Sequence, residues 1–168
     1  MQRLMQMNVQ VTEPVFLKDP QGTDLGRRII EHSVLLIDEL GLEKFTFGKL
    51  ATALGTAESS IYRYFENKRD LLVKVIEDWY ESMLADYDQQ LAGIKGTRNR
   101  LRYMIWRHLK TIHDEPALCN LMFQYLRTGK DYSQTAVYGL NRQYTRRTLD
   151  IVKEGIDADE LRGDVSLR

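Results

Sequence analysis

Apolar residues recur at helical spacing along most of this chain, and the pattern predicts a series of helices. The first of them spans residues 24–40. Asp24 can cap its N-terminus, and Gly41 can end it. Its apolar stripe consists of Leu25, Ile29, Ile30, Val34, Ile37 and Leu40.

Two short helices follow the first one closely. We expect one over residues 47–54, with Thr46 as its N-terminal cap. Gly55 then permits the left-handed backbone that a tight turn requires. The next helix is predicted over residues 58–65, so the turn at Gly55 joins two helices of about two turns each.

Four further stretches have the same helical period. Pro116 suits the first turn of a helix, and Gly155 can end the last one. The apolar stripe of the second stretch consists of Leu101, Met104, Ile105, Leu109 and Ile112. The final residues, DVSLR, are typical of the cap and first turn of another helix. We therefore expect helices over residues 68–91, 98–113, 116–127 and 133–154, and an all-α fold.

The first 23 residues lack a helical period. Met7, Val9 and Val11 alternate with polar residues, which allows a short strand, while Pro14 and Pro20 interrupt the segment. We interpret residues 1–23 as an N-terminal arm that is either extended or disordered, and disorder is the simpler hypothesis.

Composition restricts the class of protein only modestly. The 24 lysines and arginines balance 24 aspartates and glutamates, which argues mildly against a nucleic-acid binder. Between residues 47 and 69, however, four positive side chains outnumber two negative ones. The single cysteine, Cys119, excludes an intrachain disulfide and suits a reducing cytoplasm; its apolar surroundings predict packing and not reactivity. We expect neither a membrane span nor a secretion signal.

The segment from Phe47 to Lys68 is the most informative part of the chain. Ile61 and Phe65 lie four residues apart and should face the core together with Leu50 and Leu54. The same helix then exposes polar and aromatic side chains, an arrangement that suits a DNA groove. The residues left outside are Glu58, Ser59, Ser60, Tyr62, Arg63 and Tyr64.

These residues resemble the TetR/AcrR family of bacterial transcriptional regulators. The resemblance rests on FTFGKLATALG, on SSIYRYFENKRDLL, and within them on Tyr62 and Phe65 followed by Asn67-Lys68 and Leu71-Leu72. It implies a three-helix DNA-binding domain with a helix-turn-helix in residues 24–67. A helical ligand-binding and dimerisation domain would occupy residues 68–168. Family members usually continue with two more helices, so we expect this domain to be truncated at its C-terminal end.

The resemblance also implies roles for single residues. Thr46 would hold a DNA phosphate through its hydroxyl and the helix amides, Tyr62 would donate its hydroxyl to a phosphate, and Lys68 would neutralise another. Ser60, Arg63 and Tyr64 would reach base edges or the nearby backbone. Glu58 could accept from a cytosine amino group but also repels phosphate. Where the family commonly has a capping serine, this chain has Ala57. The expected DNA-binding residues are Thr46, Lys49, Glu58, Ser59, Ser60, Tyr62, Arg63, Tyr64 and Lys68.

Aromatic residues in the second half of the chain have two interpretations. They could line a pocket for an apolar or aromatic ligand, or they could simply form the core of the domain. The pocket candidates are Trp79, Trp106, His108, Phe123 and Tyr125. A further basic stretch, from Lys95 to Arg107, could contact DNA, but a solvated helix face explains it more simply.

The sequence gives little support for a metal site or for a catalytic site. His108 and His113 are one residue away from the spacing that would place both on one helix face, so we predict no metal site. Ser59 and Ser60 have no neighbouring histidine in sequence, and no Gly-rich phosphate loop or paired-carboxylate motif occurs. We therefore predict neither an enzyme nor a protein with a bound cofactor.

The hypothesis that follows is a ligand-responsive DNA-binding regulator, in this family most often a repressor. A homodimer would bind a pseudo-palindromic double-stranded operator, and a small apolar or aromatic effector of unknown identity would release it. The helix over residues 68–91 would connect the two domains. The alternative is a helical protein-interaction module that has lost DNA binding, which Glu58 and the zero net charge favour slightly.

Overall fold

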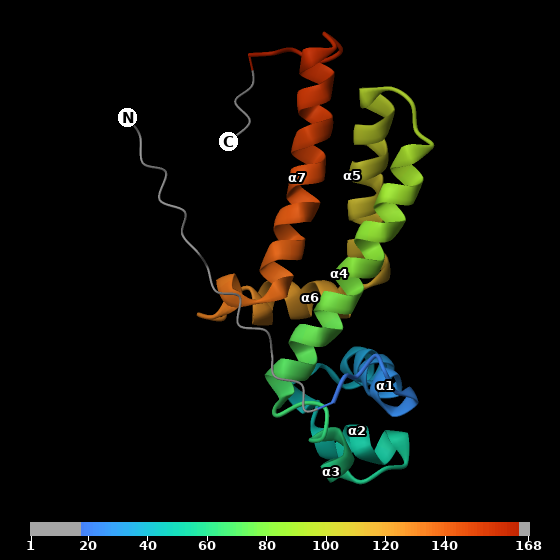
Figure 1. The fold of residues 1–168 in the computed structure, drawn as a ribbon, viewed down its shortest axis with the longest axis vertical. Coiled ribbons are helices and arrows are strands. Elements are labelled where there is room, and N and C mark those ends of the chain that lie inside the picture. The colour runs from blue at the N-terminus through green and yellow to red at the C-terminus, as the bar shows by residue number, and fades with distance from the viewer. Residues whose placement is uncertain (1–17, 165–168) are drawn as a thin grey trace.

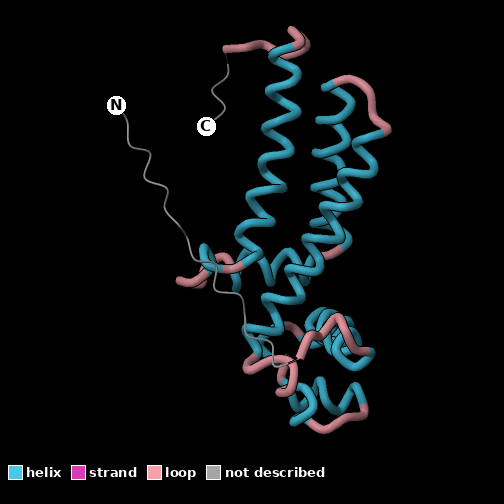
Figure 2. Tube along the Cα trace, in the orientation of Figure 1, coloured by secondary structure: helices cyan, strands magenta, loops and turns pink. Residues whose placement is uncertain are grey.

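The computed structural model describes residues 18–164, and this part of the chain is helical with no strand, as predicted (Figures 1 and 2). The possible strand around Met7 to Val11, and nearly all of the possible C-terminal helix start, lie outside the described residues. The elements are α1 (Asp24–Leu40), η1 (Leu42–Lys44), α2 (Phe47–Leu54), α3 (Glu58–Ile61), α4 (Lys68–Ala92), α5 (Thr97–Asp114), α6 (Pro116–Asn120), η2 (Leu121–Leu126), η3 (Tyr132–Gln134) and α7 (Ala136–Asp157).

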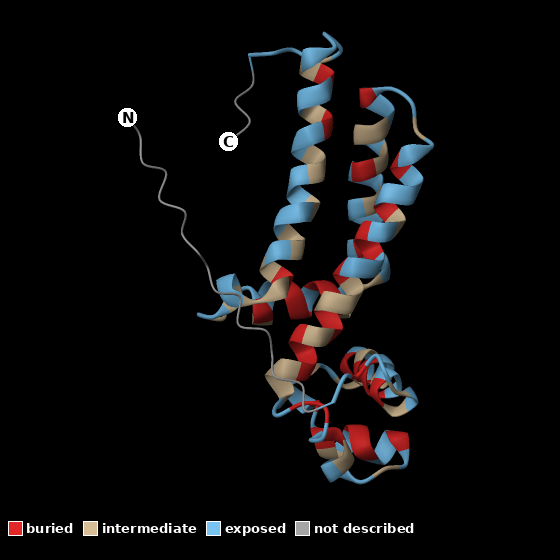
Figure 3. Cartoon of the chain, in the orientation of Figure 1, coloured by how far each residue is buried: buried red, intermediate tan, exposed pale blue. Residues whose placement is uncertain are grey.

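A small N-terminal group of helices, α1 to α3, packs around the first turns of α4 (lower part of Figure 1). Ile29, Leu50, Ile61, Phe65 and Leu71 are all fully buried in its core (Figure 3). Each such side chain contributes about 1.5–3 kcal/mol on burial. The predicted packing of α3 against α2 is confirmed.

The caps of these helices agree with the sequence except at α1. Thr23, and not Asp24, caps α1, because its hydroxyl accepts from the Gly26 amide at 3.0 Å. Asp24 is instead the first helical residue, where its charge suits the positive end of the helix. Thr46 caps α2, and Gly55 follows it in the left-handed region with φ 65°, both as predicted.

The helix α3 is shorter than the 58–65 segment that the pattern predicts. It ends at Ile61, and residues 62–64 continue as a turn. Ala57 provides no side-chain cap for its first amides, in keeping with the missing serine noted above. A single turn of helix gains little stability from its own hydrogen bonds, so the packing of buried Ile61 contributes most to holding α3 in place.

The long helix α4 leads from the small domain into a bundle with α5 and α7, and α6 with η2 crosses at the base of this bundle (Figure 1). The predicted helix 116–127 is present, but its second half, η2, is a π-helix. The last helix continues past Gly155, which is buried where a Cβ would collide with Thr97 and Leu161. Gly155 therefore permits close packing and does not end the helix.

The predicted apolar stripe of α5 is only partly buried. Met104 is buried, but Ile105 and Leu109 are 62% and 61% exposed. The apolar stripe of α5 is broader than the surface that the described helices cover. Within residues 18–164, no helix combines the length and the apolar character that a membrane span requires.

Candidate nucleic-acid interface and effector cavity

The turn between α2 and α3 is closed by backbone hydrogen bonds. The Gly55 amide donates to the Thr52 carbonyl at 3.2 Å, and the Thr56 amide donates to the Ala51 carbonyl at 3.0 Å. The left-handed Gly55 allows the chain to reverse without a side-chain clash. This geometry sets α3 beside α2 with its inner face, at Ile61, fully buried.

The opposite side of α3 faces solvent. Glu58, Ser59 and Arg63 are exposed, and Ser60 is half-buried. Tyr62 is 46% exposed, and its ring packs edge-on against Phe47 with the centroids 5.1 Å apart. These outward residues therefore share one surface. Contact with DNA by these residues stays a prediction.

Tyr64 does not belong to that surface, so the prediction that it faces outward is wrong. Its side chain is only 5% exposed, and its hydroxyl shares a hydrogen bond of 2.9 Å with the hydroxyl of Thr23, the cap of α1. Because α3 ends at Ile61, the following turn rotates Tyr64 inward. Tyr64 positions α1 against the end of the helix-turn-helix.

Lys68 also has a different position from the one that the family resemblance implies. Its Nζ donates to the carbonyls of Leu42, at 2.6 Å, and Phe45, at 3.0 Å, and lies over the Phe45 ring. Burial lowers the pKa of Lys68. The ammonium group therefore joins the first turn of α4 to the linker between α1 and α2. This internal role argues against the phosphate contact, which stays a prediction.

The remaining candidate residues, Thr46, Lys49 and Glu58, lie at or near the N-terminus of α2. The Thr46 hydroxyl accepts from the Lys49 amide at 3.3 Å, and Lys49 is exposed with its Nζ on the Lys44 carbonyl. A carboxylate oxygen of Glu58 lies 3.3 Å from the point where a Cβ on Gly48 would stand. Glu58 therefore places a negative charge at the positive end of α2, where Thr46 was expected to hold a phosphate.

A small cavity of about 50 Å³ lies in the bundle. Of the five predicted pocket residues, Trp79, His108 and Phe123 line it. Trp106 does not, because its side chain is 55% exposed on the outside of α5. Tyr125 does not either, because it lies against the guanidinium of Arg69. The full lining is Trp79, Tyr80, Met83, Tyr87, His108, Thr111, Ile112, Cys119, Phe123, Asn141 and Tyr144.

Several of these lining residues were not predicted from the sequence. Tyr80 and Met83 lie three residues apart on α4, and Asn141 and Tyr144 lie three apart on α7. This spacing places each set on one helix face and could have indicated them. Cys119 is buried, and burial raises the pKa of its thiol, which agrees with the predicted packing role.

Hydroxyl groups supply the polar part of the cavity. The Tyr144 hydroxyl lies 3.0 Å from Nδ1 of His108 and 3.4 Å from the Tyr87 hydroxyl, and Tyr80 donates to Asn141 at 3.1 Å. Burial raises the pKa of Tyr80, Tyr87 and Tyr144, so all three phenols are neutral at physiological pH. The cavity therefore presents uncharged donors and acceptors on an aromatic wall.

One charged residue of α5 contacts the cavity lining, because Arg107 donates to the hydroxyl of Thr111 at 3.1 Å. In the basic stretch of α5, Arg100 pairs with Glu154 and Arg107 pairs with Asp86, and these two arginine side chains are only 27% and 20% exposed. Among residues 18–164, no cluster of three or more histidine, cysteine or acidic side chains could hold a metal ion.

Two models of known protein families match this chain, one in each half. The model for bacterial regulatory proteins of the tetR family matches residues 29–75, and the model for the tetracyclin repressor-like C-terminal domain matches residues 95–168. Together they cover more than half of the 168 residues.

Individual proteins are similar at low identity. The fatty acid metabolism regulator protein of Bacillus subtilis (strain 168) is 22% identical over 84% of this chain and 73% of its own length. The nucleoid occlusion factor SlmA of Sodalis glossinidius (strain morsitans) is 30% identical, over 49% of this chain and 41% of that protein. This chain thus spans less than half the length of its SlmA relatives.

Solved structures share the fold. The regulator FadR from Bacillus subtilis, in complex with stearoyl-CoA, superposes with a TM-score of 0.72 at 22% identity, covering 83% of this chain and 75% of that one. The superantigen PfiT superposes with a TM-score of 0.73 at 26% identity, covering 88% and 78%.

Proposed function

We propose that this chain, which belongs to the TetR family of bacterial regulatory proteins, represses transcription at an operator and leaves it when a small molecule occupies the bundle cavity. Its family makes the chain a DNA-binding transcriptional regulator. The observation that supports the DNA-binding surface most directly is the outward side of α3. Here Ser59 on α3, and Tyr62 and Arg63 on the turn after it, are exposed, while Ile61 on the inner side of α3 is fully buried.

Two copies of α3 would enter successive major grooves of a pseudo-palindrome, about 34 Å apart, if the protein binds as a homodimer. Arg63 and Ser60 would contact base edges, while Thr46, Lys49, Ser59 and Tyr62 would contact the phosphate backbone. Glu58 would favour a cytosine near the first turn of α2. A regulator of this kind acts where the bacterial chromosome is, so we propose a cytoplasmic location.

The effector that fits the cavity is an uncharged apolar or aromatic molecule with one hydrogen-bonding group. Among the described residues that line the cavity, none is a lysine or arginine, while Tyr144, Tyr87 and Asn141 offer neutral partners. FadR of Bacillus subtilis was solved with stearoyl-CoA, whose acyl chain would suit the same apolar wall. A cavity of about 50 Å³ holds only a few non-hydrogen atoms. An effector larger than this must therefore widen the cavity.

Selection of duplexes from a random-sequence library, followed by fluorescence anisotropy, tests the DNA-binding proposal. The protein should enrich a sequence with two related half-sites. Arg63→Ala should relax preference at one or two base pairs of each half-site, at a cost of about 1–3 kcal/mol for each lost base contact. Arg98→Ala, on an exposed position of α5, is the matched control. An Arg63→Ala protein that enriches the unchanged sequence would remove Arg63 from base recognition, and no enrichment by the wild type would contradict the function itself.

A further inference from the structure

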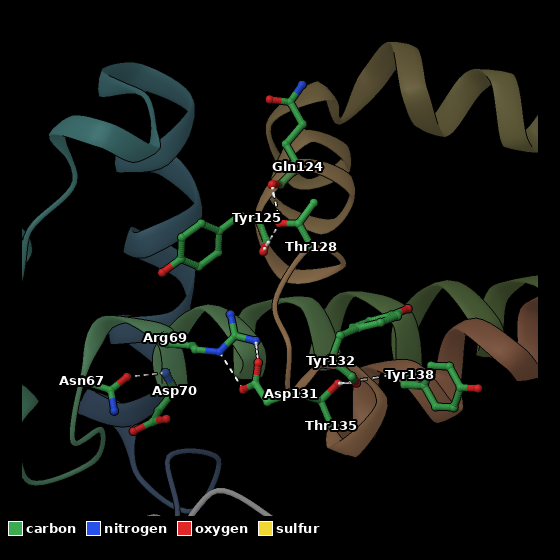
Figure 4. A network of polar contacts seen from close by, with 10 residues as sticks. All are labelled: Asn67, Arg69, Asp70, Gln124, Tyr125, Thr128, Asp131, Tyr132, Thr135 and Tyr138. Carbon is green, nitrogen blue, oxygen red and sulfur yellow. Dashed lines mark hydrogen bonds and ion pairs between the residues drawn. The ribbon is translucent and has the colours of Figure 1, made fainter.

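An ion pair connects the first turn of α4 to the loop after η2. Arg69 donates from Nε to one carboxylate oxygen of Asp131 at 2.9 Å and from Nη2 to the other, in a two-pronged arrangement (Figure 4). The Arg69 guanidinium also lies 5.9 Å from the centroid of the Tyr125 ring. Hydrogen bonding to Arg69 lowers the pKa of Asp131. Tyr125 and Asp131 together hold Arg69 from a single segment, residues 121–131.

On the side of the DNA-binding domain, Arg69 lies next to the groups that set its position. The neighbouring Asn67 caps α4 by accepting from the Asp70 amide at 3.0 Å. Lys68 binds the carbonyls of Leu42 and Phe45 in the linker between α1 and α2. Lys68 and Arg69 share the first turn of α4. A displacement of Arg69 therefore moves the same turn that Lys68 joins to this linker.

On the other side, the same segment forms part of the cavity wall. Phe123, two residues before Tyr125 on η2, lines the cavity and is 43% exposed. The wall residues on α4, such as Tyr80 and Tyr87, are almost fully buried. A ligand that widens the cavity therefore displaces Phe123 at lower cost than the α4 wall. The π-helical form of η2 supports this, because π-helical turns occur frequently at functional sites.

We propose that η2 and the Arg69–Asp131 pair form the link through which the cavity and the DNA-binding domain affect each other. A ligand that moves Phe123 shifts η2, changes how Tyr125 and Asp131 hold Arg69, and so turns the start of α4. Arg69 and Asp131 are positioning residues that contact neither the effector nor DNA. This inference rests on the proposed function. Because the coupling of two binding free energies is reciprocal, an effector that acts through η2 implies that operator binding shifts the conformations of the η2 segment even without an effector.

That reciprocity allows a test with the full chain and DNA alone. Hydrogen exchange would be measured by mass spectrometry, with and without an operator duplex selected from the random library. In the wild type, the duplex should slow amide exchange in residues 46–63 and change exchange in residues 121–131 at least threefold. In Asp131→Asn and Arg69→Gln, residues 46–63 should keep their protection, while the change in residues 121–131 should fall below 1.5-fold.

The chain contains a matched control for the chemistry of the pair. Arg147 donates to both oxygens of Asp88 at 2.6 Å within the bundle, and the exposure of these side chains, 25% and 57%, resembles the 27% and 52% of Arg69 and Asp131. Asp88→Asn should therefore preserve the exchange change in residues 121–131.

The outcomes separate the two proposals. Protection of residues 46–63 without any change in residues 121–131 of the wild type overturns the link and leaves DNA binding standing. Loss of the change in Asp88→Asn as well assigns the effect to general loosening and also overturns the link. An absence of protection in residues 46–63 contradicts the proposed function, and the link falls with it. Two variants, one at each end of the pair, guard against a folding defect in either, and thermal unfolding of both verifies that they are folded.

Discussion

Replacing Lys68 with methionine should destabilise the DNA-binding domain and leave its contacts with DNA phosphates unchanged. The substitution keeps the aliphatic stem but removes the donor to the carbonyls of Leu42 and Phe45. Hydrogen bonds from a charged donor contribute about 1.5–3 kcal/mol each. Burial of the ammonium, which lowers the pKa of Lys68, offsets part of that gain. Because the Phe45 carbonyl lies in the core and loses its partner, we expect a net loss of about 2 kcal/mol.

Urea unfolding measures the first half of this prediction. With a slope of about 2 kcal/mol per molar urea, the midpoint should fall by roughly 1 M at unchanged slope. Lys95→Met, at an exposed lysine between α4 and α5, is the control and should shift it by less than about 0.25 M.

The salt dependence of operator binding measures the second half. A lysine that neutralises one phosphate contributes about 0.9 to the slope of log affinity against log salt. Because Lys68 is directed inward, this slope should be equal in the wild type and in Lys68→Met. An unchanged urea midpoint together with a slope reduced by about 0.9 per subunit would refute the internal role and restore the phosphate contact.

Three further changes test other parts of the structure. Thr23→Ala removes the cap of α1 and the hydroxyl partner of Tyr64, and should cost about 1–2 kcal/mol in urea unfolding. Asp131→Asn should destabilise the chain at neutral pH. Since pairing with Arg69 lowers the pKa of Asp131, the wild-type advantage should be complete above the ordinary carboxyl pKa and vanish as pH falls through the lowered value, which unfolding midpoints at several pH values would follow. Tyr144→Phe removes the hydroxyl beside His108, and should weaken binding of uncharged aromatic alcohols but not of the matching hydrocarbons in calorimetry.

Much of the fold follows from local sequence pattern. The helical period located every long helix to within a few residues, and the four-residue spacing of Ile61 and Phe65 indicated the buried side of α3. The same reasoning identified Ser59, Tyr62 and Arg63 as outward residues. These features depend on neighbours within one or two turns, and such neighbours are visible in the sequence.

The corrected predictions depend on residues that are distant in sequence. Lys68 is directed inward because carbonyls 23 and 26 residues earlier lie within reach of its Nζ. Tyr64 is buried because a one-turn helix ends before it and Thr23 stands opposite. On α5, periodicity identified an apolar face at Ile105 and Leu109 but could not indicate what covers it. Tertiary contacts decide each of these cases.

The corrected position of Lys68 also changes how the two domains relate. If Lys68 bound a DNA phosphate, the cap residue Asn67 would be the main group that fixes the start of α4. With Lys68 bound to the linker between α1 and α2, and Arg69 bound to the segment after η2, consecutive residues join α4 to both domains. Neighbouring residues of a helix are separated by about 100° around its axis, so one turn can contact two different partners. Rotation of that single turn therefore changes both contacts together. This coupling is what a ligand in the bundle requires if it is to alter the spacing of two α3 helices on DNA.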